Sequence, residues 1–312
     1  MMPKVSILIC TYKTSHDHLL VALRSAQAQT WSNIEILVSD DSPTREIESI
    51  VLDLNDSRIK YYFHAPSLGP AENHWWSIFE CSGDYVSILN HDDCIEPTFI
   101  ERLMYPFGGS PQLAVSFCDH WIIDERGKRL SRESNENTAK WGRSRLSAGS
   151  IKSMQKLVID QTIPVAMGSV FVKDRIPKNI PRGAGPAYDL WLSYFLARGG
   201  GAAYYVPERL SSWRIHQSNL TNLAGQDWIL GSALCWAMIE KDPEFKEHQK
   251  DAKKRAARAY VTASRRSLEV AAVTTARAQA WTALSIKASA KAIVIIMLTL
   301  IPKRLLKFLF KY

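Results

Sequence analysis

The sequence is poor in cysteine and has no motif that pairs cysteines. Its five cysteines are odd in number, lie far apart and form no CxxC pair. Disulfide frameworks and thiolate zinc sites need suitably spaced pairs, so the pattern indicates neither kind of site. We therefore expect a protein of the reducing cytoplasm.

Glycine-rich loops that bind phosphate are missing as well. The chain contains no P-loop motif and no GxGxxG motif, the usual phosphate-binding loops of α/β proteins. A diphosphate ligand would then have to be neutralised by a divalent cation that carboxylates hold.

Long apolar runs are also absent. The N-terminal segment MMPKVSILICTYK meets a polar turn where a signal peptide would have its cleavage site, so we interpret it as a first strand. The apolar run 292–301 has about half of the ~20 residues that a membrane-spanning helix requires. The sequence thus favours neither a secretion signal nor a spanning helix.

The chain does contain enough apolar residues for a full core, together with an unevenly placed positive charge. Of its 312 residues, 46% are hydrophobic and 22% are charged, and the formal net charge is +8. The excess lies mainly from residue 246 onward. This basic region lacks interleaved aromatic residues and any recognisable nucleic-acid-binding module, so we expect no nucleic-acid partner.

Short apolar runs alternate with segments of helical spacing up to residue 89. This alternation predicts a Rossmann-like α/β fold with a doubly wound, mostly parallel sheet. The expected strands are 5–10, 34–38, 59–63 and 85–89, and the expected helices are 19–29, 46–54 and 69–81.

The rest of the chain is less regular. The polar segment 131–144 is expected to be a mobile loop of the kind that covers substrate sites. We expect an α/β domain over 1–222, a helical extension over 223–285 and a basic amphipathic tail over 286–312. Further strands are expected at 113–117, 121–123, 165–172, 204–206 and 210–213, and a further helix at 189–198.

Polar residues cluster at three of the predicted strand ends. The clusters are Thr11–Lys13, Asp40–Ser42 and Asn90–Asp93. Ligands of doubly wound sheets bind outside the carboxyl ends of the strands, so these clusters should line one crevice.

Two adjacent acids at the end of a buried strand are costly unless a cation or hydrogen-bond donors lie beside them. Asp92 and Asp93 are therefore candidate metal ligands. Magnesium and manganese prefer oxygen ligands but accept an imidazole, so His216 is a possible third ligand. Simpler roles remain open, because Asp40 and Asp41 could form a turn and the later pair could cap a helix.

Five segments in order resemble the family 2 glycosyltransferases of the GT-A fold. The resemblance covers roughly residues 4–220. The segments that carry it are VSILICTYK, NIEILVSDDSPT, SLGPAENHWWSIFECSGDYVSILNHDDCIEP, YDLWLSYFLARGG and SSWRIHQSNLT.

The resemblance implies roles for the residues at the donor site. Thr11 and Tyr12 would line the nucleotide pocket, and Asp40 or Asp41 would hydrogen-bond the base. Asp92 and Asp93 would form the acidic motif that meets Mn²⁺ or Mg²⁺ and the ribose diphosphate, with Arg214 and His216 near the diphosphate. The family commonly has an aspartate where this chain has Asn90.

The resemblance also implies a catalytic base. Asp189 would remove the proton from the acceptor hydroxyl, and Trp191 would offer a sugar an apolar face. Many relatives carry Glu-Asp where this chain has Pro186 and Ala187.

The implied function is that of a metal-dependent, inverting glycosyltransferase of bacterial surface-polysaccharide assembly. The enzyme would transfer a sugar from a UDP-type or dTDP-type donor to a hydroxyl of a glycan or lipid-linked glycan. One alternative is a nucleotidyltransferase, although CTYKTSHDHLL lacks the glycine- and lysine-rich loop of such enzymes. A second is an inactive relative that binds sugar nucleotide or acts as a scaffold, which the departures at Asn90 and before Asp189 keep open.

The C-terminal tail points to a membrane surface. Lys303, Lys307 and Lys311 recur every four residues and share one helical face, while apolar residues fill the remainder. We expect such a helix to hold the enzyme as a peripheral protein on the inner face of the plasma membrane. Packing of the tail on its own domain or on a second subunit is the alternative.

Overall fold

A computed structural model describes residues 2–216 and 225–301. The chain divides into two compact units. The sheet unit contains Met1–Asn179 and Leu192–Asn219, and the helical unit contains Ile180–Trp191 and Leu220–Tyr312. The division at 219/220 lies near the expected boundary at residue 222. The helical unit also includes the earlier segment Ile180–Trp191.

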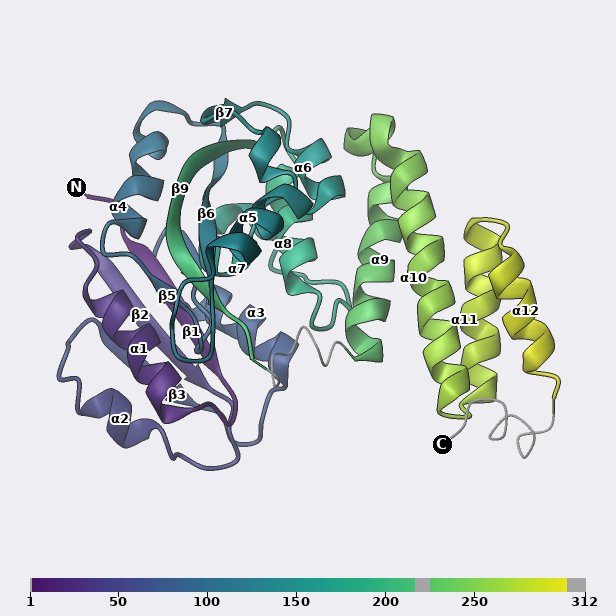
Figure 1. Cartoon of the computed structure of the whole chain (residues 1–312), viewed down its shortest axis with the longest axis horizontal. Coiled ribbons are helices and arrows are strands. Elements are labelled where there is room, and N and C mark those ends of the chain that lie inside the picture. The colour runs from purple at the N-terminus through teal and green to yellow at the C-terminus, as the bar shows by residue number, and fades with distance from the viewer. Residues whose placement is uncertain (1, 217–224, 302–312) are drawn as a thin grey trace. The chain divides into compact units, whose positions relative to one another are not determined.

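A mixed sheet of nine strands forms the sheet unit within the described residues (Figure 1). The strand order is β3-β2-β1-β4-β8-β6-β9-β5, and β7 pairs with β9. The run from β3 to β4 is parallel throughout, as is the pair of β6 and β9, whereas β8 lies antiparallel to both of its neighbours. The strands are β1 (Val5–Thr11), β2 (Ile34–Asp40), β3 (Ile59–Phe63), β4 (Tyr85–Ile88), β5 (Cys94–Ile95), β6 (Leu113–Ile123), β7 (Gly149–Ile151), β8 (Ser169–Val172) and β9 (Ala202–Arg214).

Helices cover both faces of the sheet, as the alternation of side chains along β1 requires. Val5, Ile7 and Ile9 pack into one core with residues of α1. Cys10 points to the other face, where its Sγ lies 3.4 Å from Ser77 Oγ of α3. The helices of this part include α1 (His16–Gln27), α2 (Glu48–Leu52), α3 (Pro70–Glu80), α4 (Phe99–Met104) and α6 (Gln155–Asp160). The expected mostly parallel α/β sheet is confirmed.

Two long strands replace four of the short ones that we expected. The segments 113–117 and 121–123 belong to the single strand β6, and 204–206 and 210–213 belong to β9. The expectation was wrong for β6 because Asp119 interrupts its apolar pattern. Arg143 Nε donates to Asp119 Oδ1 at 2.8 Å, so the carboxylate is neutralised inside the fold.

The segment 131–144 is a helix for most of its length, so the expectation of a loop was wrong. Its helix α5 (Ser131–Lys140) buries only one residue, Ser134, which explains the lack of apolar periodicity. Polar contacts hold it instead. Ile122 N donates to Ser134 Oγ at 2.9 Å, and Thr138 Oγ1 donates to Asp119 Oδ2 at 2.6 Å.

The apolar run 165–172 is only half strand. It begins with the short helix α7 (Val165–Gly168), in which Met167 has a φ of +63°, and continues as β8. Ala166 and Met167 both depart from helical backbone angles, so the run begins with an irregular turn that an apolar pattern does not distinguish from a strand.

The helical unit confirms the expected helical extension. Its small core is rich in alanine, which allows close approach of the helices, and includes Leu268, Ala276, Ala280, Ala283 and Ile295. The helix α8 (Tyr188–Ala197) begins in this unit and continues in the sheet unit. The other helices are α9 (Gln226–Lys241), α10 (Gln249–Glu269), α11 (Val273–Ile286) and α12 (Ala290–Leu298).

Among the helices of the described residues, none has the length and apolar character needed to cross a membrane. The basic face expected at Lys303, Lys307 and Lys311 lies outside the described residues. Of the expected tail, the structure therefore describes residues 286–301.

Candidate functional site

Asp40 joins the ends of three neighbouring strands. Its Oδ1 accepts hydrogen bonds from Thr11 Oγ1 and from Ser42 N, both at 3.0 Å, and its Oδ2 accepts one from Tyr61 OH at 2.8 Å. Asp40 is completely buried. Burial and the bond to Asp40 raise the pKa of Tyr61 above its ordinary value. The carboxylate that was expected near the base is thus satisfied by donors of the protein itself.

Asp41 holds the loop that leads into α3. Its two oxygens accept hydrogen bonds from Leu68 N at 2.6 Å, Gly69 N at 2.8 Å and Ser67 Oγ at 2.8 Å. Gly69 has a φ of +87°, a conformation that favours glycine. Asp41 therefore fixes this loop from a buried position.

Tyr12 and Lys13 are the residues of the first cluster that face solvent. Tyr12 is 52% exposed, and Lys13 Nζ lies 5.4 Å from the centre of its ring. Because β1 and β4 are parallel neighbours, with Leu8 opposite Ile88, Tyr12 and the acidic residues after β4 leave the same edge of the sheet.

The turn after β4 encloses Asp93 completely. Arg214 N donates to Asp93 Oδ1 at 2.8 Å, and Asn90 Nδ2 donates to Asp93 Oδ2 at 2.8 Å. Burial, reinforced by the adjacent Asp92, raises the pKa of Asp93 well above its ordinary value. The amide of Asn90 thus supplies a donor where a carboxylate would repel Asp93.

Asp92 occupies the more open position of the pair and meets the end of β9. His216 Nε2 lies 2.9 Å from Asp92 Oδ2. Arg214 Nε donates to Asp92 O at 2.8 Å, and its Nη1 donates to Asp124 O and Glu125 O, each at 3.1 Å. The buried Arg214 guanidinium therefore braces the acidic turn from behind.

Two further histidines lie at this site, His91 within the turn and His18 in α1, and the sequence pattern predicts a role for neither. Thr14 Oγ1 lies 2.6 Å from His91 Nδ1, which ties the loop after β1 to the turn after β4. The rings of His18 and His216 have centroids 5.8 Å apart. Burial lowers the pKa of His91, although Asp92 opposes that effect. The signal that could have found them is their place next to two strand ends already predicted to converge.

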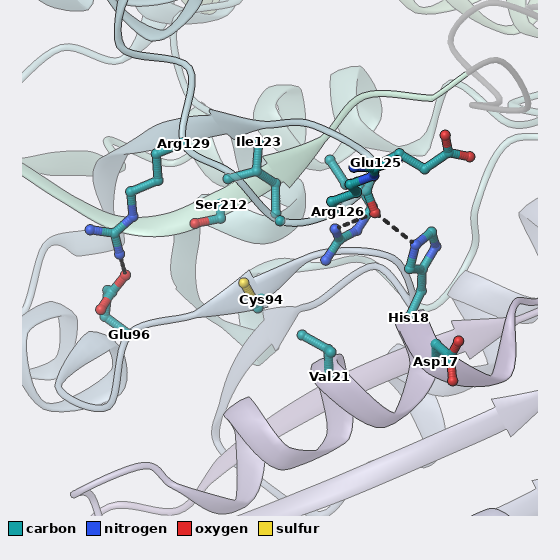
Figure 2. Close-up of a pocket in the computed structure, with 12 residues that line it drawn as sticks. Asp17, His18, Val21, Cys94, Glu96, Ile123, Glu125, Arg126, Arg129 and Ser212 are labelled. Carbon is teal, nitrogen blue, oxygen red and sulfur yellow. Dashed lines mark hydrogen bonds and ion pairs between the residues drawn. The ribbon is translucent and has the colours of Figure 1, made fainter.

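A cavity of about 490 Å³ lies directly beside the acidic turn (Figure 2). Arg214, which contacts Asp92 and Asp93 of the turn, also lines the cavity. His18 lines it as well, with its Nε2 3.3 Å from Glu125 O. An ion pair between Glu96 and Arg129 lies at the other end of the view in Figure 2. The remaining lining residues are Asp17, Val21, Cys94, Ile123, Arg126, Gly127 and Ser212.

The expected metal ligands fit a cation only in part. In residues 2–216 and 225–301, no group of three or more histidine, cysteine, aspartate or glutamate side chains could hold a metal ion. Both oxygens of Asp93 accept protein hydrogen bonds. Asp92 Oδ2 and His216 Nε2, which lie 2.9 Å apart, are an oxygen and a nitrogen of the types that manganese accepts, and they would hold such an ion together with oxygens of a bound diphosphate.

Asp189 and Trp191 belong to the helical unit. Asp189 lies in the first turn of α8, where Leu190 N donates to its Oδ1 at 2.8 Å, and burial raises its pKa above the ordinary value. Trp191 is completely buried, and its Nε1 donates to Gly231 O of α9 at 3.1 Å. The indole expected to meet a sugar is here part of a core.

Relatives of known sequence bear on this arrangement. Residues 6–173 match the sequence model of the family described as Glycosyl transferase family 2. An uncharacterised glycosyltransferase of Rickettsia typhi is 26% identical over 226 residues, which cover 71% of this chain and 67% of the relative. The GalNAc(5)-diNAcBac-PP-undecaprenol beta-1,3-glucosyltransferase of Campylobacter jejuni is 30% identical over 135 residues, which cover 42% of each chain.

Two solved structures share the fold. Staphylococcus aureus TarS in complex with UDP-GlcNAc matches with a TM-score of 0.65 at 12% identity and covers 98% of this chain and 86% of its own. The mannosyltransferase PcManGT of Pyrobaculum calidifontis, in complex with GDP-Man and Mn²⁺, matches with a TM-score of 0.57 at 13% identity and covers 99% of this chain and 84% of its own. The sheet with its helical extension is therefore of the GT-A type.

Proposed function

The chain belongs to glycosyltransferase family 2, and from this membership we propose that it transfers a sugar from a nucleoside diphosphate to a hydroxyl group of a lipid-linked glycan. The observation that carries the proposal is the braced acidic turn, in which Asp92 pairs with His216 while Asp93 and Arg214 hold the turn in place. Groups held in this way before the donor binds need no rearrangement when charge develops.

The donor occupies the edge of the sheet between Tyr12 and Asp92. The half-exposed ring of Tyr12 contacts the base, and the diphosphate lies toward Asp92 and His216. Thr11, Asp40 and Asp41 act by fixing the two loops that form the wall. A UDP-type or dTDP-type donor is the choice that the family resemblance favours.

Asp92 and His216 would hold a divalent cation, Mn²⁺ or Mg²⁺, when the diphosphate is bound. Such an ion stabilises the negative charge of the departing nucleoside diphosphate. PcManGT, which shares the fold, carries Mn²⁺ together with its nucleotide sugar.

Inverting transfer needs a base, and Asp189 is our candidate. It takes the proton of the acceptor hydroxyl, whose oxygen forms the new bond to the anomeric carbon. The bond between that carbon and the diphosphate oxygen breaks, and the nucleoside diphosphate leaves with the electron pair. The pKa of Asp189, raised by burial, makes its carboxylate a stronger base than an exposed aspartate.

The proposed acceptor is a lipid-linked glycan of bacterial surface polysaccharide assembly. The Campylobacter jejuni relative is named for an undecaprenol diphosphate-linked glycan, and its similarity covers 42% of this chain. A lipid-linked acceptor is anchored in a membrane, so an enzyme with a membrane-facing surface would lie close to it.

Isothermal titration with UDP, dTDP and GDP, each with Mn²⁺ and with EDTA, tests the donor site. We expect one nucleotide to bind in a metal-dependent way and Asp92→Asn to weaken it at least about tenfold. Asp84→Asn is the matched control, because this exposed aspartate precedes β4 at its opposite end. If no nucleotide binds under any condition, the donor-site proposal fails.

Transfer is tested separately. Asp189→Asn should keep donor binding and lose at least about a hundredfold in the transfer rate, and proton NMR of the product should show an inverted anomeric centre. Nucleotide binding by the unchanged protein without transfer to any lipid-linked acceptor would favour the scaffold alternative.

A further inference from the structure

Helix α12 is apolar on both of its faces. Its inner face packs into the core of the helical unit through Ala292 and Ile295. On the opposite side, Ile293, Val294 and Met297 are 44%, 53% and 61% exposed, and Leu300, one turn further along, is 73% exposed. The spacing of these four residues places them on one helical face.

An exposed apolar face of this kind calls for a covering partner. A helix that is apolar all round is normally buried, and contiguous exposed apolar residues mark an interaction site. The neighbouring helix α11 adds Trp281, which is 57% exposed. Tryptophan is a residue that membrane interfaces favour.

The positive charge of the C-terminal segment indicates which kind of partner covers this face. Residues 270–312 contain seven basic residues and no acidic residue. Two of the basic residues, Lys287 and Lys291, are exposed and lie just before and within α12. A surface that offers both an apolar interior and negative charge fits this combination, and an anionic lipid bilayer is such a surface.

The face is also held rigidly. Arg277 of α11 donates from Nε to Thr299 Oγ1 at 2.9 Å and from Nη2 to Thr299 O at 2.8 Å. Ser289 Oγ accepts from Ala292 N at 3.4 Å at the other end. Arg277 therefore ties the C-terminal end of α12 to α11, and Ser289 caps its N-terminal end, which lowers the ordering cost on binding.

The length of α12 decides how it would meet the bilayer. Nine residues extend about 13.5 Å, roughly half of the ~30 Å hydrocarbon core. The helix is too short to span and suits a position in the plane of the interface.

We propose that the outer face of α12, flanked by Lys287 and Lys291, docks this protein on an anionic membrane surface. The apolar side chains enter the boundary between headgroups and acyl chains, and the lysines contact the anionic headgroups. This docking does not depend on the donor chemistry proposed above, and the two are tested by different measurements.

Co-sedimentation of the full chain with vesicles tests the proposal. Vesicles of phosphatidylcholine with about 30% phosphatidylglycerol should bind the protein, and pure phosphatidylcholine should bind it much more weakly. Met297→Asp should reduce the partition coefficient at least about tenfold. Met238→Asp, which makes the same change at a methionine of α9 that is 42% exposed, is the matched control and should bind nearly normally.

A second pair of variants isolates the charge contribution. Lys291→Glu should weaken binding to the anionic vesicles about fivefold or more, and the effect should shrink as salt is raised. Lys178→Glu, an equal charge change at an exposed site of the sheet unit, should have little effect. Circular dichroism and nucleotide titration on each variant separate membrane binding from folding and from the donor site.

Three results would overturn the proposal. The first is absence of binding to anionic vesicles, and the second is equal binding by Met297→Asp and the unchanged protein. The third is a Met297→Asp variant that still binds vesicles but has a different oligomeric state by light scattering. That result would mean that the face is a contact between copies of the chain.

Discussion

At the scale of single residues, one hydrogen bond joins the two loops that would enclose a nucleotide. Thr14 Oγ1 and His91 Nδ1 are 2.6 Å apart, and they follow β1 and β4 respectively. Thr14→Val keeps the shape of the side chain and removes this bond. We expect the Kd for the preferred nucleotide to rise about fivefold, equivalent to about 1 kcal/mol.

Calorimetric titration measures the change, and Thr14→Ser serves as the control because it restores the hydroxyl. An unchanged Kd in Thr14→Val would show that the two loops are positioned independently of each other.

A second residue, Glu35, makes the stability of the sheet depend on pH. Burial alone would raise its pKa, but hydrogen bonds from Lys60, Ser6 and Ser82 outweigh it and hold the pKa at about 2. A depressed pKa in the folded state means that the stabilisation is full above the ordinary value near 4.5 and is lost as the pH falls toward 2.

Glu35→Gln should therefore lower the free energy of unfolding by about 2 kcal/mol at pH 7. Urea unfolding at pH 7, 5 and 3 should show the difference from the unchanged protein shrinking at the lowest pH. The exposed Asp174→Asn provides the control, and a difference that stayed constant over this range would assign the effect to packing alone.

At the scale of elements, α9 fixes the segment that carries the candidate base. A Cβ atom added to Gly231 would lie 2.0 Å from Ala184 O, and Gly231 O accepts the hydrogen bond of the Trp191 indole. Gly231→Ala would push residues 180–191 away from α9. We expect a loss of about 1–3 kcal/mol in stability together with reduced transfer and unchanged donor binding.

Thermal unfolding and a transfer assay measure the two effects. Gly109→Ala is the matched control, since an added Cβ there meets no atom within 4 Å. Equal melting temperatures for the two variants would show that the close approach of Gly231 to Ala184 O does not limit stability.

The elements also show what the sequence could and could not predict. The strands and helices up to residue 89 were predictable because apolar spacing alone determines their faces. The helix α5 was not, because Ser134 and Thr138 hold it through polar contacts with distant residues. The candidate site, too, was predictable only in part. The convergence of strand ends follows from topology, but the donors that satisfy Asp93 come from Asn90 and the remote Arg214.

At the scale of the whole molecule, the two units have separate cores, one around β1 and α1 and one around α10 and α11. The proposed donor contacts Tyr12, Asp92 and His216 of the sheet unit. Differential scanning calorimetry should therefore show two transitions, of which only one moves upward with nucleotide. At a nucleotide concentration of 100 Kd the stabilisation should be about 2.7 kcal/mol.

Asp92→Asn, which should bind nucleotide at least about tenfold more weakly, should show a smaller upward shift of that transition at the same nucleotide concentration. A single transition in the unchanged protein that shifts as a whole would mean that the units unfold cooperatively.

The brace between Arg214 and the acidic turn has a consequence for anyone who builds chimeras of related enzymes. The family match ends at residue 173, whereas Arg214 supplies both the amide that binds Asp93 and the guanidinium that binds Asp92 O. A crossover placed at that boundary would combine the turn of one parent with the strand end of another. A chimera that keeps the proposed donor site must therefore take residues 90–93 and 212–216 from the same parent, even though more than a hundred residues separate the two segments in the sequence.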